Sequence, residues 1–284
     1  MAALPTIVVL TEAIGSESYL AHFAAALAEP LGARLVLFHA FQDVVMDPEF
    51  GYTPAPLAID TQREIQDALA ALAARLPVES EVRVVIEPLR DAVEDAIRLY
   101  QPMLLVLGGA GRTDDWFDRL FANTSLSILR SAHYPLLLVP EGGPQPARVP
   151  RHALVAVDGD PFHLEATGLA ARDLFSALQL KCSVVQALTT AADHDQPVIA
   201  AARGLATVRE GLHLDALPDS AFHPVRGHDP ADVILQVASG LAADLLVLVA
   251  RRRSFLGDLF HRSITAQVAR RSSVPVLVLP ERAA

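Results

Sequence analysis

The residues best suited to chemistry are three glycines that follow a strongly apolar segment. Residues 103–107 (MLLVL) form a continuous apolar run, which is typical of a strand buried on both faces of a parallel sheet. Gly108, Gly109 and Gly111 come next, and Arg112 follows them. Glycine lets the backbone turn sharply and leaves its N–H groups open to an anion, and arginine pairs well with phosphate. The pattern favours a phosphate-binding turn; the simpler alternative is a turn that only joins a strand to a helix.

The same order of segments is repeated half a chain away. Residues 103–140 and 244–280 each contain an LLVL run, a motif with Asp, Leu and Phe, and a closing apolar strand that follows a proline. The two copies begin about 140 residues apart. A repeat on this scale indicates two copies of one domain rather than a solenoid.

The order of strand, G-x2-G-x9-G-[ST], helix and strand resembles the nucleotide loop of universal stress proteins, and the resemblance extends over nearly the whole chain as a tandem pair. Gly108 and Gly111 match the first two glycines of that loop. Ten residues then separate Gly111 from Ala122, where the family has nine and then glycine, and Asn123 and Thr124 stand where the family has Ser or Thr. The resemblance implies triphosphate binding by loop N–H groups, a helix N-terminus and a hydroxyl.

The family also has an aspartate after its first strand, near the adenine. In the first half this position is Glu12, which is longer by one methylene group. The second half keeps the aspartate as Asp158, with Asp160 in the usual place of a serine. The resemblance therefore assigns Glu12 and Asp158 to the two ligand sites.

The second loop keeps the spacing of the motif and loses its glycines. Val249, Arg252 and Arg262 stand at the glycine positions, and Ser263 keeps the hydroxyl. Side chains there occupy the space that phosphates need, and positive φ becomes costly without glycine. The arginines of residues 251–253 offer an alternative anion contact by side chain. We prefer a solvated basic loop, and we expect no ATP bound there in the family's usual manner.

No other group of residues predicts a catalytic or metal site. His223, His228 and Asp229 form one cluster, but no pair of histidines has the spacing of a zinc site. The serines lack a G-x-S-x-G elbow, and G-x-G-x-x-G is absent after either first strand. Trp116 and Phe117 flank the first loop, and we interpret them as anchors of the following helix. We expect no catalytic and no metal-binding residue.

The composition predicts a two-domain globular chain. With 284 residues and 52% hydrophobic content, two domains can each bury a core. No segment reaches the ~18 uninterrupted apolar residues of a membrane helix. The first ten residues lack the basic start and the long apolar core of a signal peptide, so we expect none. The net charge of −10 argues against general nucleic-acid binding. The single cysteine, Cys182, fits a reducing cytosol and is expected to be an inert buried thiol.

Apolar runs that alternate with amphipathic segments predict alternating strands and helices in both halves. The predicted strands are 6–10, 33–41, 82–87, 103–107, 136–139, 153–157, 180–188, 220–226, 245–248 and 276–279. Four predicted helices span 61–76, 91–100, 198–212 and 229–241. Two others end near residues 31 and 178, and a further helix begins near residue 117. Asp160 is expected to cap the helix that begins at Pro161, and 42–59 is expected to be a surface loop.

We predict an α/β fold: two tandem doubly wound domains, each a five-stranded parallel sheet flanked by helices, over residues 1–141 and 152–284 with a linker at 142–151. By the resemblance, strands 136–139 and 276–279 pair with each other. The predicted pairing would cover two exposed sheet edges.

The leading function hypothesis is a non-catalytic cytoplasmic universal stress protein that senses or sequesters a ligand or a protein partner. ATP or another nucleotide is the candidate ligand, in the first domain only. The alternatives are a ligand-free interaction module and a very slow ATPase, for which the sequence offers no obvious general base. We expect a monomer that contains an internal pair of domains, or a homodimer, with no nucleic-acid or membrane partner.

Overall fold

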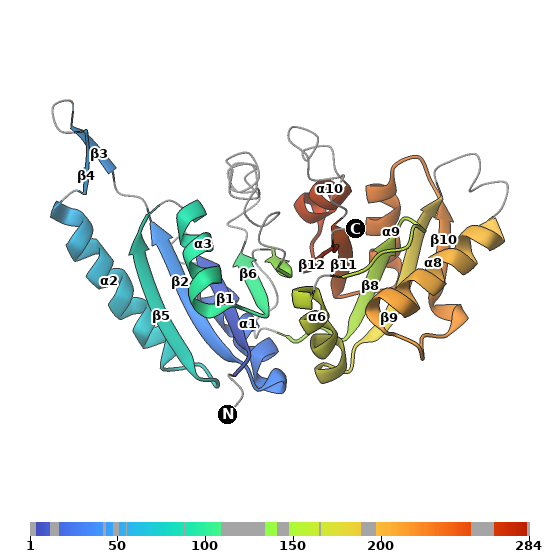
Figure 1. Ribbon diagram of the computed structural model, residues 1–284, viewed down its shortest axis with the longest axis horizontal. Helices are drawn as coiled ribbons and strands as arrows, with labels where there is room; N and C mark the ends of the chain where they lie inside the picture. Colours follow the sequence, from blue (N-terminus) through green and yellow to red (C-terminus); the bar gives the residue numbers. More distant parts are fainter. Residues whose placement is uncertain are drawn as a thin grey trace. The chain divides into compact units, whose positions relative to one another are not determined.

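The computed structural model describes residues 4–11, 17–41, 44–47, 51–54, 56–87, 89–108, 134–140, 148–164, 166–188, 197–250 and 264–282. By its contacts the chain divides into two units (Figure 1). The first comprises Met1–Ile128 with Glu141–Arg148, and the second comprises Leu129–Pro140 with Val149–Ala284. The segment 129–140 thus belongs by its contacts to the second unit, although it precedes the linker.

The first unit is a parallel sheet in the order β6-β1-β2-β5, with helices between successive strands (Figure 1). Its strands are β1 (Thr6–Thr11), β2 (Arg34–Phe41), β5 (Ser80–Ile86) and β6 (Leu104–Gly108). Its helices are α1 (Glu17–Leu31), α2 (Pro56–Ala73) and α3 (Leu89–Tyr100). β1 and β6 are apolar and almost fully buried, as their continuous apolar runs predict.

The expected surface loop at 42–59 was wrong. It contains an antiparallel pair of short strands, β3 (Val44–Asp47) and β4 (Gly51–Pro54), and α2 begins already at Pro56. β-Branched residues favour a strand over Val44 and Val45, and proline is well tolerated in the first turn of a helix. The Pro and Gly content of this segment therefore marks the boundaries of elements rather than a lack of them.

The second unit has five parallel strands and one antiparallel strand, in the order β10-β9-β8-β11-β12-β7. The strands are β7 (Leu136–Val139), β8 (His152–Val157), β9 (Lys181–Leu188), β10 (Phe222–Arg226), β11 (Leu245–Ala250) and β12 (Val276–Pro280). The helices are α6 (Ala166–Ala177), α8 (Pro197–Leu212), η1 (Asp219–Ala221), α9 (Pro230–Gly240) and α10 (Ile264–Arg271). The predicted pairing of the two closing strands is confirmed, because β7 runs antiparallel to β12 with Leu137 opposite Leu277.

The expected start of the second domain's first helix was also wrong. Asp160 does not cap a helix at Pro161; instead α6 begins at Ala166. The Arg282 N–H donates to the His163 carbonyl at 2.7 Å, and Leu164 forms an antiparallel bridge with the neighbouring Glu281. Pairing with the end of the chain therefore outweighs the local helix-start signal.

The helices that follow the first strands sit differently in the two units. α1 packs on β1, β2 and β6, whereas α6 makes its main strand contact with β12. α2 packs on β5, whereas α8 packs on β8, β9 and β10. No helix in the described part of the chain is both long and apolar enough to span a membrane.

Candidate nucleotide site

In sheets of this type, ligands bind outside the carboxyl ends of the strands, at the point where the strand order reverses. That point lies between β1 and β6 in the first unit and between β8 and β11 in the second. Of the predicted site residues, the structure describes Gly108 and Asp158. The remaining predicted positions lie outside the described residues: Glu12, Gly109, Gly111, Arg112, Asn123, Thr124, Ser263, the arginines of 251–253, Arg262, Trp116 and Phe117.

Gly108 ends β6 at the predicted edge of the first sheet. Leu107, the residue before it, pairs with Leu10 of β1, so Gly108 lies beside the end of β1. A Cβ atom at Gly108 would lie 2.8 Å from Cδ2 of Leu20, a buried residue of α1. The close approach of α1 to β6 is therefore sufficient to explain this glycine, independently of any ligand.

Val249 takes the place of Gly108 in the second unit. It is the second-last residue of β11, is half-buried, and pairs with Leu279 of β12. Because α6 packs mainly on β12, it does not impose on β11 the close approach that α1 imposes on β6. The shifted helix accounts for a side chain at this position.

The turn at Asp158 is stabilised by a hydrogen bond within the turn and packs against Gln186, a residue that the sequence did not predict. The Asp160 N–H donates to Oδ1 of Asp158 at 3.1 Å. Gly159 has φ of +88°, and a Cβ there would lie 2.5 Å from Nε2 of Gln186. Gln186, on β9, is only 2% exposed, and its Oε1 has no hydrogen-bond partner among the described residues. A Cβ on Gly204 of α8 would overlap that oxygen, so a side chain at either glycine would displace the buried amide.

A second residue that the sequence did not predict, Glu87, follows β5 in the first unit. Its Oε1 is buried without a hydrogen-bond partner in the described part of the chain. Burial raises the pKa of this carboxyl, and the carboxylates of Asp95 and Asp91 raise it further. It is a polar group near the carboxyl edge of the sheet, but it lies on the outermost strand rather than beside β1 and β6.

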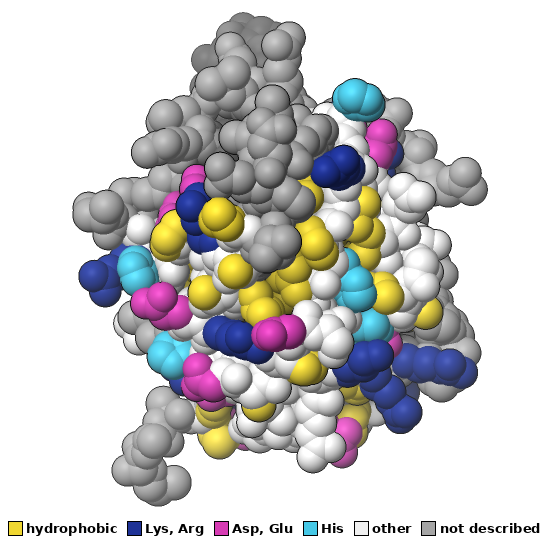
Figure 2. Space-filling view, turned by 90° about the vertical axis from the view of Figure 1, so that its right-hand side faces the viewer, with side chains coloured by type: hydrophobic (Ala, Val, Ile, Leu, Met, Phe, Trp, Pro, Cys, Tyr) yellow, Lys and Arg dark blue, Asp and Glu magenta, His cyan; other side chains and the backbone are white. Residues whose placement is uncertain are grey.

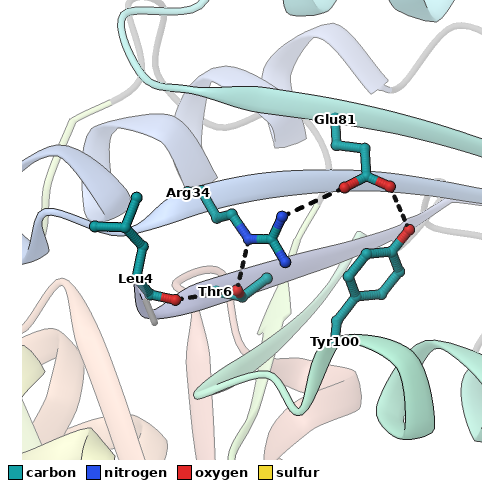
Figure 3. Close-up of polar contacts among 5 residues, drawn as sticks. All are labelled: Leu4, Thr6, Arg34, Glu81 and Tyr100. Atoms are coloured by element: carbon teal, nitrogen blue, oxygen red, sulfur yellow. Dashed lines mark hydrogen bonds and ion pairs between the residues drawn. The ribbon is translucent and has the colours of Figure 1, made fainter. Parts of the chain in front are cut away.

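The largest polar network of the first unit lies at the opposite end of its sheet, where the strands begin (Figure 3). The Arg34 Nε donates to Oγ1 of Thr6 at 3.0 Å, and its Nη1 lies 3.5 Å from Oε2 of Glu81. The Tyr100 hydroxyl donates to Oε1 of Glu81 at 2.6 Å, and the guanidinium lies 5.8 Å from the centre of the Tyr100 ring. Burial and the bond to Glu81 raise the pKa of Tyr100 to about 12. The network joins β1, β2, β5 and α3.

The second unit has a different set of side chains at the corresponding end. His152 Nε2 lies 2.9 Å from Oγ of the buried Ser183. The carboxylate of Asp244 accepts the backbone N–H of His152 at 2.7 Å and that of Arg151 at 2.9 Å. Burial lowers the pKa of His152, and the nearby Lys181 charge lowers it further. Neither network was predicted, because the residues meet only through the strand register.

The remaining candidate groups show no arrangement for metal or thiol chemistry. No cluster of three His, Cys, Asp or Glu residues in the described ranges could hold a metal ion. Asp229, from the histidine-rich cluster, caps α9 by accepting the Ala231 N–H at 2.8 Å. Cys182 is half-buried rather than fully buried, and burial raises the pKa of its thiol to about 11, so it is unreactive near neutral pH.

Comparison with solved structures supports the same architecture. A candidate universal stress protein from Pseudomonas aeruginosa UCBPP-PA14 aligns with a TM-score of 0.63 and 16% identity, over 98% of this chain and 94% of that one. A functionally unknown protein from Pseudomonas aeruginosa PAO1 aligns with a TM-score of 0.62 and 17% identity, over 98% and 93%. A universal stress protein from Archaeoglobus fulgidus DSM 4304 aligns with a TM-score of 0.62 and 14% identity, over 96% of both chains. At these identities the likeness concerns the fold.

A comparison with curated proteins gave no significant match. The sequence model of the universal stress protein family, in contrast, matches the chain twice, over residues 4–140 and 150–280. These ranges cover nearly all of the chain and coincide with the repeat and with the α/β sheets described above. The chain therefore belongs to the universal stress protein family and carries two of its domains in tandem.

Proposed function

We propose that this protein is a non-catalytic cytoplasmic member of its family, which senses or sequesters a ligand or partner and binds one nucleotide, in the first domain. The observation that carries the proposal is the difference between the two loops. Gly108 ends β6 and is followed by Gly109 and Gly111, whereas Val249 of β11 and Arg252 stand at the positions of Gly108 and Gly111 in the second half. Only the first loop keeps a backbone that a triphosphate can approach closely.

The position of Gly108 is consistent with this proposal, although packing against Leu20 also requires a glycine there. Gly111 lies outside the described residues, so its part in the proposal rests on the loop motif in the sequence. The cytoplasmic location rests on the single cysteine, which leaves no intramolecular disulfide and fits a reducing compartment. The non-catalytic role rests on the sequence, which supplies no obvious general base at either loop.

A second candidate function is an interaction module without a ligand. The packing of Leu20 on Gly108 favours it, because that glycine then has a purely structural reason. In the second domain, the Asp158 carboxylate accepts the Asp160 N–H of its own turn. That contact occupies one of the oxygens that the family resemblance assigns to a ligand.

Equilibrium dialysis of the full chain with ATP separates these functions. We expect saturation at one ATP per chain, loss of binding in Gly111→Val because the branched Cβ fills the phosphate space, and unchanged binding in Arg252→Ala. Circular dichroism of Gly111→Val controls for folding. No binding by the wild type would favour the interaction module. Loss of binding in Arg252→Ala alone would show that the site lies in the second domain and not in the first. Phosphate release over hours tests the slow ATPase.

A further inference from the structure

We propose that the base of the second unit, meaning the end of its sheet where the strands begin, is an acid-sensitive latch. A proton taken up by His152 breaks its contact with Ser183 and loosens the beginnings of β8 and β9. The base of the first unit, which has no histidine at the matching position, stays closed under the same conditions. This proposal rests on the packing of the second unit and does not depend on nucleotide binding.

The hydrogen bonds fix which ring nitrogen carries the proton at neutral pH. The ring of His152 bonds to the backbone of Leu241, at the end of α9. The Leu241 N–H already donates to the Val237 carbonyl at 2.9 Å, so Leu241 offers its carbonyl as an acceptor. The neutral ring has one N–H, which serves that carbonyl, and Nε2 then accepts from the Ser183 hydroxyl at 2.9 Å.

A second proton reverses the His152–Ser183 bond. Nε2 becomes a donor, so the Ser183 oxygen must accept and its own hydrogen needs a new acceptor. Ser183 is 4% exposed, and among the described residues its side chain bonds only to His152. A buried hydroxyl hydrogen without an acceptor is costly, so the charged ring and the closed latch are incompatible.

The charged groups around His152 add to this incompatibility. The charges of Lys181 on β9 and His223 on β10 both disfavour a charged His152. Asp244, which precedes β11, favours it, but its carboxylate already accepts the backbone N–H groups of Arg151 and His152. Burial is the largest effect, and together these groups hold the pKa of His152 below its ordinary value of 6.5 despite the Leu241 carbonyl.

The sign of the pH dependence follows from this direction. Above pH 6.5 the imidazole is neutral in the folded and the unfolded chain, so the latch keeps its full stability. Below it, the unfolded chain binds the proton first, so the second unit loses stability as pH falls. In the first unit, Thr6 and Arg34 occupy the register positions of His152 and Lys181, and neither titrates in this range.

Hydrogen exchange of the full chain at pH 7.5 and 5.5, corrected for intrinsic rates, tests the latch. Protection of residues 181–188 should fall in acid, by at most about tenfold, relative to residues 34–41. His152→Thr, which installs the first unit's residue, should remove that difference. Equal loss in both strands, or an unchanged difference in His152→Thr, would overturn the proposal.

An NMR titration of His152 in the wild type keeps the test valid if the variant does not fold. The midpoint should lie below 6.5 and should coincide with a shift of the Ser183 amide resonance. A midpoint at or above 6.5, or a Ser183 amide that does not respond, would contradict the latch.

Discussion

In both units the second strand begins with the same backbone hydrogen bond. The Arg34 N–H donates to the Pro5 carbonyl at 2.9 Å, and the Lys181 N–H donates to the Arg151 carbonyl at 2.9 Å. The side-chain contacts around these bonds differ: Arg34 of the first unit bonds to Thr6 and Glu81, whereas His152 of the second unit contacts Ser183. The shared fold is thus specified by the strand register and the apolar runs, while the polar contacts that close each sheet have diverged.

The outermost strands show the same divergence. In β5 the even-numbered backbone groups face away from β2, because the Leu35 N–H donates to the Glu79 carbonyl. The Gln62 side chain of α2 donates to one of these outward carbonyls, that of Val84, at 3.0 Å. A helix side chain thus covers part of the edge that β5 leaves unpaired.

β10 protects its edge in another way. The Gly227 N–H donates to the Leu188 carbonyl of β9, so Pro224 lies among the residues whose backbone faces outward. Proline has no N–H to offer to another strand. Figure 2 looks onto the side of the second unit on which β10 lies, and it shows apolar side chains next to histidine and basic ones. Two unrelated devices thus discourage edge-to-edge pairing.

The largest expected effect concerns the helix packing that distinguishes the units. A Cβ on Gly211 of α8 would overlap the ring of the buried Phe162. Gly211→Ala should therefore lower the free energy of unfolding of the second unit by about 1–3 kcal/mol. Gly240→Ala, in α9, is the matched control, because nothing lies within 4 Å of the added atom. It should raise that free energy by about 0.5–1 kcal/mol, as alanine favours helix. Urea unfolding measures both, and equal effects would refute the close packing of α8.

An exchange of the two strand-start residues sharpens the comparison of the bases. Arg34→Lys keeps the charge but loses the planar contacts to Thr6, Glu81 and the Tyr100 ring. It should cost the first unit about 1 kcal/mol in urea unfolding. Lys181→Arg should change the second unit little, because Lys181 is an exposed residue at the start of β9. A similar cost for both exchanges would show that the networks contribute no specific stability.

The smallest effect concerns the residues that follow two helices, α1 in the first unit and α9 in the second. Gly32, after α1, has φ of +57°, and Ala242, after α9, has φ of +50°. Glycine adopts this conformation without strain, whereas alanine does not. Ala242→Gly should therefore raise the free energy of unfolding by about 0.5 kcal/mol, and Gly32→Ala should lower it by about 1 kcal/mol. Both changes should appear as small shifts of the melting temperature. A destabilising effect of Ala242→Gly would show that the left-handed backbone conformation of Ala242 carries no strain.

Burial explains which parts of the fold could be predicted from the sequence. The predicted strands at 6–10, 103–107 and 136–139 are apolar apart from Thr6, because these segments are covered on both faces of their sheets. Their predicted bounds lie within one residue of the observed β1, β6 and β7. The pairing of β7 with β12 followed from the family resemblance and not from periodicity.

The missed start of α6 and the missed polar networks have a common cause. The start of α6 depends on the Arg282 contact with His163, and the first polar network joins Arg34 to Glu81 across two strands. Such contacts depend on strand register and chain crossing, which local propensity does not encode. Gln186 alone left a signal, as a polar residue within the apolar run of β9. Seven of the predicted ligand positions lie outside the described residues and stay predictions.

The central claim is that one fold occurs twice in this chain while only the first copy keeps the backbone for a nucleotide. Photo-crosslinking of the full chain with an azido analogue of ATP, followed by peptide mapping, tests it most directly. The label should fall on peptides within residues 4–140, and an excess of unmodified ATP should prevent it. Labelling of peptides within 150–280 that ATP also prevents would contradict the claim, and so would the absence of any ATP-sensitive label.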